Sequence, residues 1–552
     1  MSSVHAGLHG TAYTVFQGST PEPFGVDILG VLRNAQGPGE DLILARLTGA
    51  KAEYTGVVAG MSGSPVYIDG KLVGALAFRI GEFAKEPIAG ITPIGEMLAV
   101  RDFDGNSPGL ASNLPTSASS EIKPIDTPLV FSGFSPAALA LWKEHAPPLG
   151  PGLEPQAGLG GSGGQATSGP AKSADTLPPL QPGAAVSALL VEGDMEIAAT
   201  CTVTYLDAGH LLACGHPLTQ FGAVSLPMTK ADIVATLPSP AGSFKIVNTG
   251  ALAGAFTQDR QTAIGGLLGA TAHMIPVEIA IHNAQATRTI HLRVLDQAQL
   301  TPTAMLVSLF QALQETPGYA EEDSYRVHAT VRLAGYPPVE INTLAAPGGL
   351  GPAPLAAALN VALRFNALYS SADRQTSFEG VHIEVDVLGG RHSSTLSRAA
   401  VEQSRVHAGD RVTVAATLAP YRGDPQSLRI PVTLPASLPG GDVRLLVSDG
   451  PTLDRLLAAG RSGGNTPLGG TVAQLNTMHA DDQIYVTLLA PEAEINVDGR
   501  VLASVPLSVA NLLLPSHERD RASLHSESAQ TLTGVPLGAS FTGEQILTLR
   551  VE

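Results

Sequence analysis

The chain has 552 residues and a formal net charge of −17 at pH 7, because acidic residues outnumber Lys and Arg by 49 to 32. A surface this acidic repels phosphate backbones and anionic lipid, so we expect no binding to nucleic acid or to a membrane surface. The 60 Gly and 42 Pro residues, with only 15% charged and 5% aromatic residues, disfavour coiled coils and helical repeats and favour β-rich domains. At one domain per roughly 100–200 residues, the length predicts about three to five domains.

Several classes of protein are disfavoured by missing patterns. A transmembrane helix needs about 18 apolar residues in a row, and the nearest stretch, residues 263–281, is interrupted by His273, Pro276 and Glu278. The first ten residues lack the basic and apolar regions of an export signal, so they do not reveal the compartment. There is no HExxH, P-loop or EF-hand motif, and we expect neither a metal site nor a cofactor.

The first hundred residues are predicted to form short strands separated by turns. Strands are expected at 13–16, 25–32, 41–47 and 56–59, and a hairpin at 65–78 turns at Asp69-Gly70. Asp-Gly between two apolar runs is among the stronger local hairpin patterns, because both central residues of a type I′ turn need a positive φ. We interpret this region as a small closed β-barrel.

The stretch from 107 to 186 differs in composition. A short helix at 136–145 carries the only tryptophan, Trp142, which we expect to dock the helix. From 146 to 185, 17 of 40 residues are Gly or Pro, which leaves too little apolar surface to order the segment. We interpret it as a flexible linker, and its r.m.s. span of roughly 35 Å is enough to cross the face of a small domain.

The β-pattern returns after residue 186. Helices are predicted at 302–315, where Thr301 is the N-cap and Pro302 the first helical residue, and at 354–368. Alternating strands from 411 onward, between Pro and Gly turns, suggest a β-sandwich, and Asp498-Gly499 marks a further turn. The predicted regions are a barrel (1–106), a linker with a short helix (107–186), a second barrel (187–300), a mixed connecting region (301–400), an Ig-like sandwich domain (401–465) and a β-rich C-terminal unit (466–552).

The segment most informative about chemistry is Gly60-Met-Ser-Gly-Ser-Pro65. A serine held in a Gly-rich turn between strands can expose its Oγ while the N–H groups of Gly60 and Ser62 converge on one point, as an oxyanion hole requires. Any Gly/Ser turn of a β-protein could look the same, so the six residues alone leave both interpretations open.

These residues resemble a known family. Gly60 to Pro65, the hairpin that follows and Gly90-Ile-Thr-Pro-Ile94 are similar to the end of the SpoIVB peptidase domain, the S55 family of trypsin-like serine proteases. The other half of that domain is matched by Cys201 to Pro217, by Ser243-Phe-Lys-Ile246 and by Phe256 to Gly265. The resemblance covers residues 10–100 and 187–275, and implies a trypsin-like double β-barrel in a mainly β chain. The family's His half precedes its Ser half, whereas here the order is reversed.

The resemblance implies roles for individual residues. Ser62 is the nucleophile and His216 the general base, while His210 is expected to be solvated. The family's upstream aspartate has no counterpart at 47–50, and Asp259, 43 residues after His216, is the best replacement for the third member. Asp41 and Asp207 are weaker candidates, an ion pair with Arg260 is an alternative role for Asp259, and a Ser-His dyad with a backbone or solvent orienter also remains open.

Further expectations concern the substrate groove and the cysteines. Gly56, six residues before Ser62, is expected to form the floor of the specificity pocket and to favour a small or apolar P1 residue. Ala77, Phe78 and Arg79 are expected to pair with the substrate backbone. Cys201 and Cys214 lie within disulfide reach if the turn between them is centred on residues 207–209, and a bridge would imply export. Two buried thiols are the alternative.

Three functions are compatible with these patterns to different degrees. The first is a bacterial, extracytoplasmic serine endopeptidase that acts on protein or peptide substrates through Ser62, His216 and Asp259. The second is a catalytically inactive, protease-like surface or scaffold protein that binds peptides or partners. An esterase is disfavoured, because Ser62 lies in no strand-turn-helix nucleophile elbow.

Overall fold

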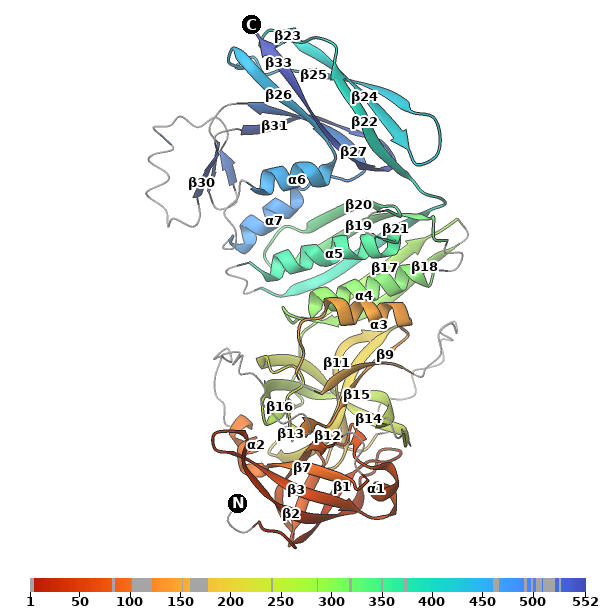
Figure 1. Cartoon of the computed structure of the whole chain (residues 1–552), viewed down its shortest axis with the longest axis vertical. Helices are drawn as coiled ribbons and strands as arrows, with labels where there is room; N and C mark the ends of the chain where they lie inside the picture. The colour runs from red at the N-terminus through yellow and green to blue at the C-terminus, as the bar shows by residue number, and fades with distance from the viewer. Residues whose placement is uncertain are drawn as a thin grey trace. The chain divides into compact units, whose positions relative to one another are not determined.

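The structure is a computed structural model of the whole chain (Figure 1). It describes residues 4–552 except 82–84, 102–121, 151, 159–176, 240–241, 285, 317–319, 349–350, 372–375, 460–465, 491–493, 498–499, 503–508, 510–521 and 526–527. The contacts divide the chain into two compact units, the first made of residues 1–274 and 292–304 and the second of 275–291 and 305–552. The predicted turn at 498–499 and much of the predicted linker lie outside the described residues.

The first unit begins with a closed six-stranded antiparallel barrel. Its order around the barrel is β1-β2-β3-β7-β6-β5, and β5 returns to β1. Apolar side chains at alternate positions, among them Val26, Ile28 and Ile91, fill its core. The strands are β1 (His9–Thr14), β2 (Glu22–Gly37), β3 (Glu40–Thr48), β5 (Pro65–Ile68), β6 (Lys71–Ile80) and β7 (Ile88–Pro93).

The expected hairpin turn is present between β5 and β6. Asp69 and Gly70 have φ angles of 49° and 73°, the positive pair that a type I′ turn needs. The same connection that carries the Ser62 turn also holds α1 (Ala50–Thr55) and β4 (Val58–Ala59), and α2 (Ile94–Arg101) follows β7.

A second closed barrel in the same unit repeats the topology of the first. Its order is β11-β12-β13-β16-β15-β14, and β14 returns to β11. In each barrel the first three strands in the chain are neighbours and the last three follow in reverse order. The predicted double barrel is therefore confirmed. The strands are β11 (Ala185–Gly193), β12 (Glu196–Asp207), β13 (His210–Ala213), β14 (Gly222–Leu237), β15 (Ser243–Arg260) and β16 (Ala263–Leu268).

The segment between the barrels contains more structure than its composition indicates. It adds β8 (Ile122–Pro124) to β6 of the first barrel, and β9 (Thr127–Ser132) to β12 of the second. Helix α3 (Pro136–His145) begins at Ser135, whose side chain accepts from the N–H of Ala138, and β10 (Leu153–Ala157) pairs with β9. As expected, Trp142 docks the helix, and its ring lies 5.3 Å from that of Phe131.

The second unit starts with a sheet flanked by helices. Strand β17 (Met274–His282) pairs in parallel with β21 (Phe378–Leu388), which continues through β19 (Ser324–Leu333) to β20 (Val339–Ala345). Strand β18 is Thr287–Leu295. The predicted helices are α4 (Thr301–Gln314) and α5 (Ala353–Tyr369), each within one residue of its expected bounds.

The C-terminal strands form two sheets that share one core, as the predicted sandwich requires. Core residues Val412 and Ile430 come from one sheet, and Leu445 and Val486 from the other, so strands on both sides of residue 465 contribute. The elements are β22 (Ser393–Val401), β23 (Arg405–Val406), β24 (Arg411–Pro420), β25 (Gln426–Thr433), β26 (Gly441–Ser448), α6 (Gly450–Ala459), α7 (Leu468–Asn476), β27 (Gln483–Ala490), β31 (Ser528–Pro536), β32 (Ser540–Thr542) and β33 (Glu544–Val551), with a separate small sheet of β28 (Glu494–Val497), β29 (Arg500–Leu502) and β30 (Ala522–His525).

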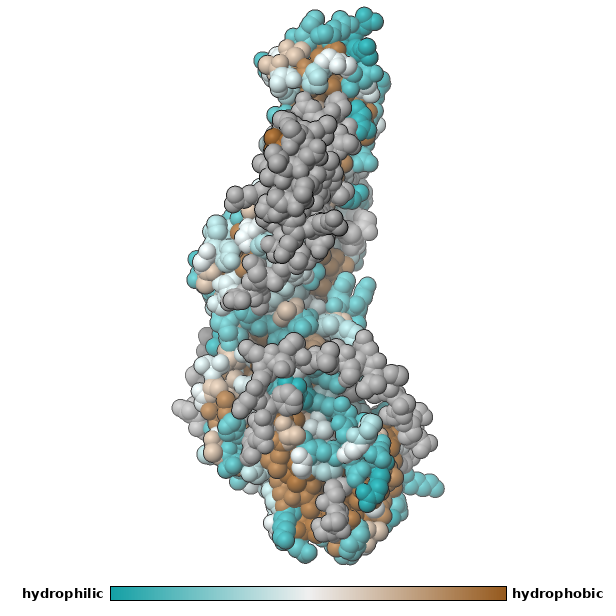
Figure 2. Space-filling model, turned by 90° about the vertical axis from the view of Figure 1, so that its left-hand side faces the viewer, coloured by the Kyte–Doolittle hydropathy of each residue, from teal (hydrophilic) through white to brown (hydrophobic). Residues whose placement is uncertain are grey.

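The surface reflects the low share of charged residues. The face in Figure 2 mixes hydrophilic residues with apolar ones, and a run of apolar residues lies in the lower part of the view. Among the described helices, none combines the length and apolar character needed to cross a bilayer.

Candidate active site

Ser62 lies in a tight turn that glycine makes possible. Gly60 and Gly63 have φ angles of 92° and 93°, and the N–H and Oγ of Ser64 both donate to the carbonyl of Met61. A Cβ on Gly63 would lie 2.0 Å from the carbonyl oxygen of Thr202, so no other residue fits there. The side chain of Ser62 is fully buried.

The Ser62 turn of the first barrel is fixed to strand β12 of the second. The N–H of Thr202 donates to the Ser62 carbonyl at 2.8 Å, and the hydroxyl of Thr204 donates to the carbonyl of Gly63 at 2.7 Å. The hydroxyl of Thr202 donates to the carbonyl of Gly60 at 3.0 Å. The two barrels therefore meet at the serine.

His216 reaches the same place from the second barrel. It follows β13, where Gly215 has a φ of 71° and accepts a hydrogen bond from Thr92 of the first barrel. Its Nε2 lies 3.5 Å from the hydroxyl oxygen of Thr127, which in turn lies 3.3 Å from the Oγ of Ser62. Ser62 and His216 thus converge on one threonine hydroxyl, although 154 residues separate them in the sequence.

The environment of His216 favours a neutral ring. Burial lowers the pKa of the imidazole, and backbone hydrogen bonds with Pro217 and Ile125 only partly oppose this. The carbonyl of Pro217, 2.8 Å from Nδ1, can only accept a hydrogen bond, so it favours the tautomer that carries its proton on Nδ1 and a lone pair on Nε2. A neutral ring with a free Nε2 lone pair is the form that can act as a general base.

The hydrogen bonds that the described residues make to Asp259 come from the loop after His216 and not from His216 itself. The buried carboxylate of Asp259 accepts hydrogen bonds from the N–H groups of residues 218–220 and from the hydroxyl of Thr219. Burial raises the pKa of Asp259, and these hydrogen bonds counteract the increase. The carbonyl of Pro217 holds the imidazole instead, which matches the alternative of a backbone orienter. Asp259 holds the loop that follows His216.

The other carboxylates considered from the sequence lie in different surroundings. Asp41 pairs with Arg33 at 3.5 Å, and Asp207 is exposed at the β12–β13 turn, next to the exposed His210. The guanidinium of Arg260 donates from Nε to the side chain of Gln258.

Residues 2–92 match the model of the SpoIVB peptidase S55 family. The N-terminal barrel is thus similar to the SpoIVB peptidase S55 family. The match includes Ser62 and ends before the second barrel, so His216 lies outside it. No curated protein and no solved structure matches the chain.

Gly60, the expected oxyanion donor, lies in the first barrel and hydrogen-bonds to the segment between the barrels. Its N–H donates to the carbonyl oxygen of Asp126 at 3.0 Å, so it is aimed at a carbonyl group. Its own carbonyl accepts from the hydroxyl of Thr202 and, at 3.2 Å, from Nζ of Lys245. Lys245 also donates to the hydroxyl of Thr14 at 2.7 Å.

Sequence reasoning missed the roles of Thr127 and Lys245. Lys245 is 1% exposed, and burial lowers the pKa of its ammonium to about 7. Lys245 lies in Ser243-Phe-Lys-Ile246, one of the segments that resemble the S55 family. A single lysine between apolar residues on a strand is the pattern that could have indicated a buried ammonium. No pattern marks Thr127, whose importance comes from the pairing of β9 with the second barrel.

A pocket of about 550 Å³ lies beside the segment that leads into the Ser62 turn. Gly56 and Arg79 both line it, together with residues of the 85–88 segment and Ser243 of β15. Arg79 pairs through its guanidinium with the carboxylate of Asp126 at 3.4 Å. The pocket that Gly56 lines thus contains two cations, Arg79 of β6 and Lys85.

Cys201 and Cys214 are joined by a disulfide, with their Cα atoms 5.3 Å apart. The bridge links β12 to the end of β13, two residues before His216. It therefore restrains the loop that carries the general-base candidate. Among the described residues, no cluster of His, Cys, Asp and Glu could hold a metal ion.

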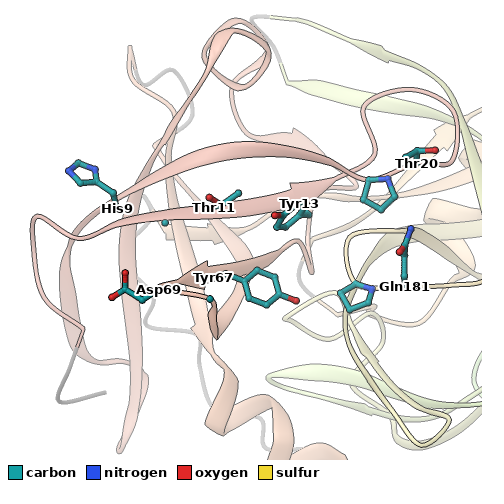
Figure 3. Close-up of a pocket in the computed structure, with 11 residues that line it drawn as sticks. His9, Thr11, Tyr13, Thr20, Tyr67, Asp69 and Gln181 are labelled. Carbon is teal, nitrogen blue, oxygen red and sulfur yellow. The ribbon is translucent and has the colours of Figure 1, made fainter.

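A second pocket of about 750 Å³ lies on the outside of the first barrel (Figure 3). Its labelled residues include Tyr13 and Tyr67, whose rings meet edge to face with centroids 5.9 Å apart. None of Ser62, Thr127 and His216 lines this pocket. It is separate from the candidate active site.

Proposed function

We propose that this chain is a serine endopeptidase in which Ser62 is the nucleophile and His216 the general base. The observation that carries the proposal is the convergence of Ser62 Oγ and His216 Nε2 on the Thr127 hydroxyl. Two side chains from separate barrels are brought together by hydrogen bonds between Thr202 and Thr204 and the serine turn. The S55 match of residues 2–92 supports the same assignment for the serine half.

The reaction assigns one task to each group. The Oγ of Ser62 attacks the carbonyl carbon of the substrate, while its proton passes to Nε2 of His216. The N–H groups of Gly60 and Ser62 stabilise the negative charge on the carbonyl oxygen. His216 returns the proton to the leaving amine, and water then hydrolyses the acyl-enzyme by the same steps in reverse.

Two other residues act as positioning residues. The carbonyl of Pro217 favours the tautomer of His216 with its proton on Nδ1, and Asp259 holds the loop at 218–220. For Ser62 to contact His216 directly, the hydroxyl of Thr127 must leave its place between them. The Cys201–Cys214 bridge supports an oxidising, extracytoplasmic location.

A non-catalytic, peptide-binding protein is the second candidate. The observation in its favour is that Thr127 separates Ser62 from His216 and that Ser62 is fully buried. Such a protein would hold a peptide at the barrel interface without cleaving it.

Labelling with a fluorophosphonate tests the proposal. We expect wild type to be labelled, peptide mapping to place the label on Ser62, and both Ser62→Ala and His216→Ala to abolish labelling. His210→Ala is the matched control, because this histidine is exposed in the turn before β13, and it should label like wild type. Label on another residue, or no label on folded wild type, would exclude this peptidase mechanism and favour the binding protein.

A further inference from the structure

A segment of the chain itself lies along the strand expected to receive substrate. In β8 and the residues after it, Pro124 pairs with Phe78 and Lys123 with Arg79 in antiparallel register. The N–H of Ile125 then donates to the carbonyl of Ala77 at 2.8 Å. Residues 122–125 therefore occupy the backbone positions that an extended peptide would take on β6.

The next two residues lie at the reacting groups. The carbonyl oxygen of Asp126 accepts from the N–H of Gly60, the proposed oxyanion donor, at 3.0 Å. The side chain of Thr127 contacts both Ser62 and His216. The carbonyl of Asp126 thus lies at the proposed oxyanion donor, and the side chain of the next residue lies at the proposed nucleophile and base.

The side chain of Asp126 indicates what the neighbouring pocket recognises. Its carboxylate lies 3.4 Å from the guanidinium of Arg79, and only 18% of the Arg79 side chain is exposed. Arg79 lines the pocket that Gly56 also lines. Two carboxylates also line the pocket: Glu86 pairs with Arg46, and Glu53 accepts from the N–H of Gly49. A partly buried guanidinium discriminates strongly in favour of a carboxylate.

We propose that residues 122–127 lie as a bound substrate would, and that Arg79 selects Asp or Glu immediately before the cleaved bond. The inference rests on the proposed peptidase function and names its substrate class, peptides and proteins with an acidic P1 residue. Gly56 leaves room at the pocket floor, and Arg79 supplies the charge. The preference differs from the small or apolar residue expected from Gly56 alone.

The internal segment competes with any added peptide. Because it is covalently attached, its local concentration is high, and it lowers the rate for every peptide. The internal segment lowers the rate for each added peptide by the same factor. The ratio of kcat/KM between two peptides therefore depends on the pocket alone. This ratio is therefore the quantity to measure on the full chain.

The experiment uses four fluorogenic peptides that differ only in having Asp, Glu, Ala or Lys before the cleaved bond. We expect wild type to prefer Asp or Glu over Ala by about tenfold or more in kcat/KM, since a partly buried charge pair contributes at least about that factor. Arg79→Ala should bring the ratio near one, and Arg79→Glu should turn the preference toward Lys. Arg33→Ala is the control, because Arg33 is an exposed arginine of the same barrel and should leave the ratio unchanged.

A binding measurement separates this inference from the peptidase proposal. In the Ser62→Ala variant, fluorescence anisotropy of labelled peptides should show tighter binding of the Asp peptide than of the Ala peptide, and Arg79→Ala should remove the difference. Hydrolysis or binding without an acidic preference, or a preference that survives Arg79→Ala, overturns the inference and leaves the peptidase standing. Acid-selective binding without Ser62 labelling overturns the peptidase and retains the role of Arg79.

Discussion

The hydroxyl oxygen of Thr127 lies 3.3 Å from the Oγ of Ser62, and it occupies the place through which serine and imidazole would have to meet. A threonine 65 residues after Ser62 thus contacts both the proposed nucleophile and the proposed base. This relationship depends on β9, which carries Thr127, being part of the second barrel's sheet.

Removing the Thr127 side chain should bring Ser62 and His216 into contact. We expect Thr127→Ala to raise the rate of fluorophosphonate labelling by about tenfold, since serine activation requires a nucleophile–base distance of about 2.6–3.2 Å. Thr127→Val is the matched control, because it replaces the hydroxyl with a methyl group of similar size, and it should not speed labelling. A slower rate in both variants would mean that the hydroxyl is needed for the reaction.

The pH dependence of labelling should reflect the environment of His216. Burial lowers the pKa of this imidazole below its ordinary value of 6.5. Because the neutral ring is the active form, labelling should persist as the pH falls below 6.5 and disappear only at the lowered pKa. Labelling rates across a pH series measure this limit. His210→Ala should leave the limit in place, and a loss of labelling well above pH 6.5 would contradict the assignment.

Lys245 should make stability depend on alkaline pH. Its pKa is about 7 in the folded chain, whereas the ordinary value for a lysine is 10.5. Between pH 7 and 10.5 the unfolded chain therefore binds more protons than the folded chain. The free energy of unfolding should therefore rise with pH from about 7 to 10.5, with a slope of at most about 1.4 kcal/mol per pH unit. Urea unfolding followed by the fluorescence of Trp142 measures the slope. Lys245→Met should remove this contribution, while Lys71→Met, at an exposed position, should keep it.

The disulfide should stabilise the loop that carries His216. Closing a loop of 13 residues contributes about 3 kcal/mol to the free energy of unfolding. We expect the Cys201→Ser, Cys214→Ser double variant to lose about that amount in urea unfolding and to label more slowly. Addition of a reductant to the double variant should change nothing, which separates loss of the bridge from other effects of reduction. An unchanged unfolding midpoint would contradict this role.

Local chemistry made part of the architecture predictable. The Asp69-Gly70 turn and the helix that begins after Ser135 depend on residues adjacent in sequence, and the structure has both at the expected positions. The contacts of Thr127 and Asp126 with the Ser62 turn depend on segments about 65 residues apart that meet only when both barrels have formed. The Gly and Pro content after residue 146 indicated a linker, and it gave no information about the strands at 122–132.

Asp259 should matter first for stability and only indirectly for catalysis. Its carboxylate accepts from the buried N–H groups of Leu218 and Thr219, from the part-buried N–H of Gln220 and from the hydroxyl of Thr219. Asp259→Ala should therefore lower the free energy of unfolding by about 3 kcal/mol, because each buried donor left without an acceptor is costly. Asp259→Asn keeps the shape and one acceptor oxygen, and should lose less stability.

The two variants also separate a positioning residue from a triad member. If Asp259 only holds the loop, the labelling rate of Asp259→Asn, measured well below its unfolding midpoint, should stay within about threefold of wild type, and its pH limit should not move. A true triad aspartate fixes the imidazole tautomer, and its replacement by Asn costs about 10⁴-fold in rate. A fall of that size in a folded Asp259→Asn variant would show that Asp259 turns toward His216 during the reaction and that Pro217 holds the ring only in the resting state.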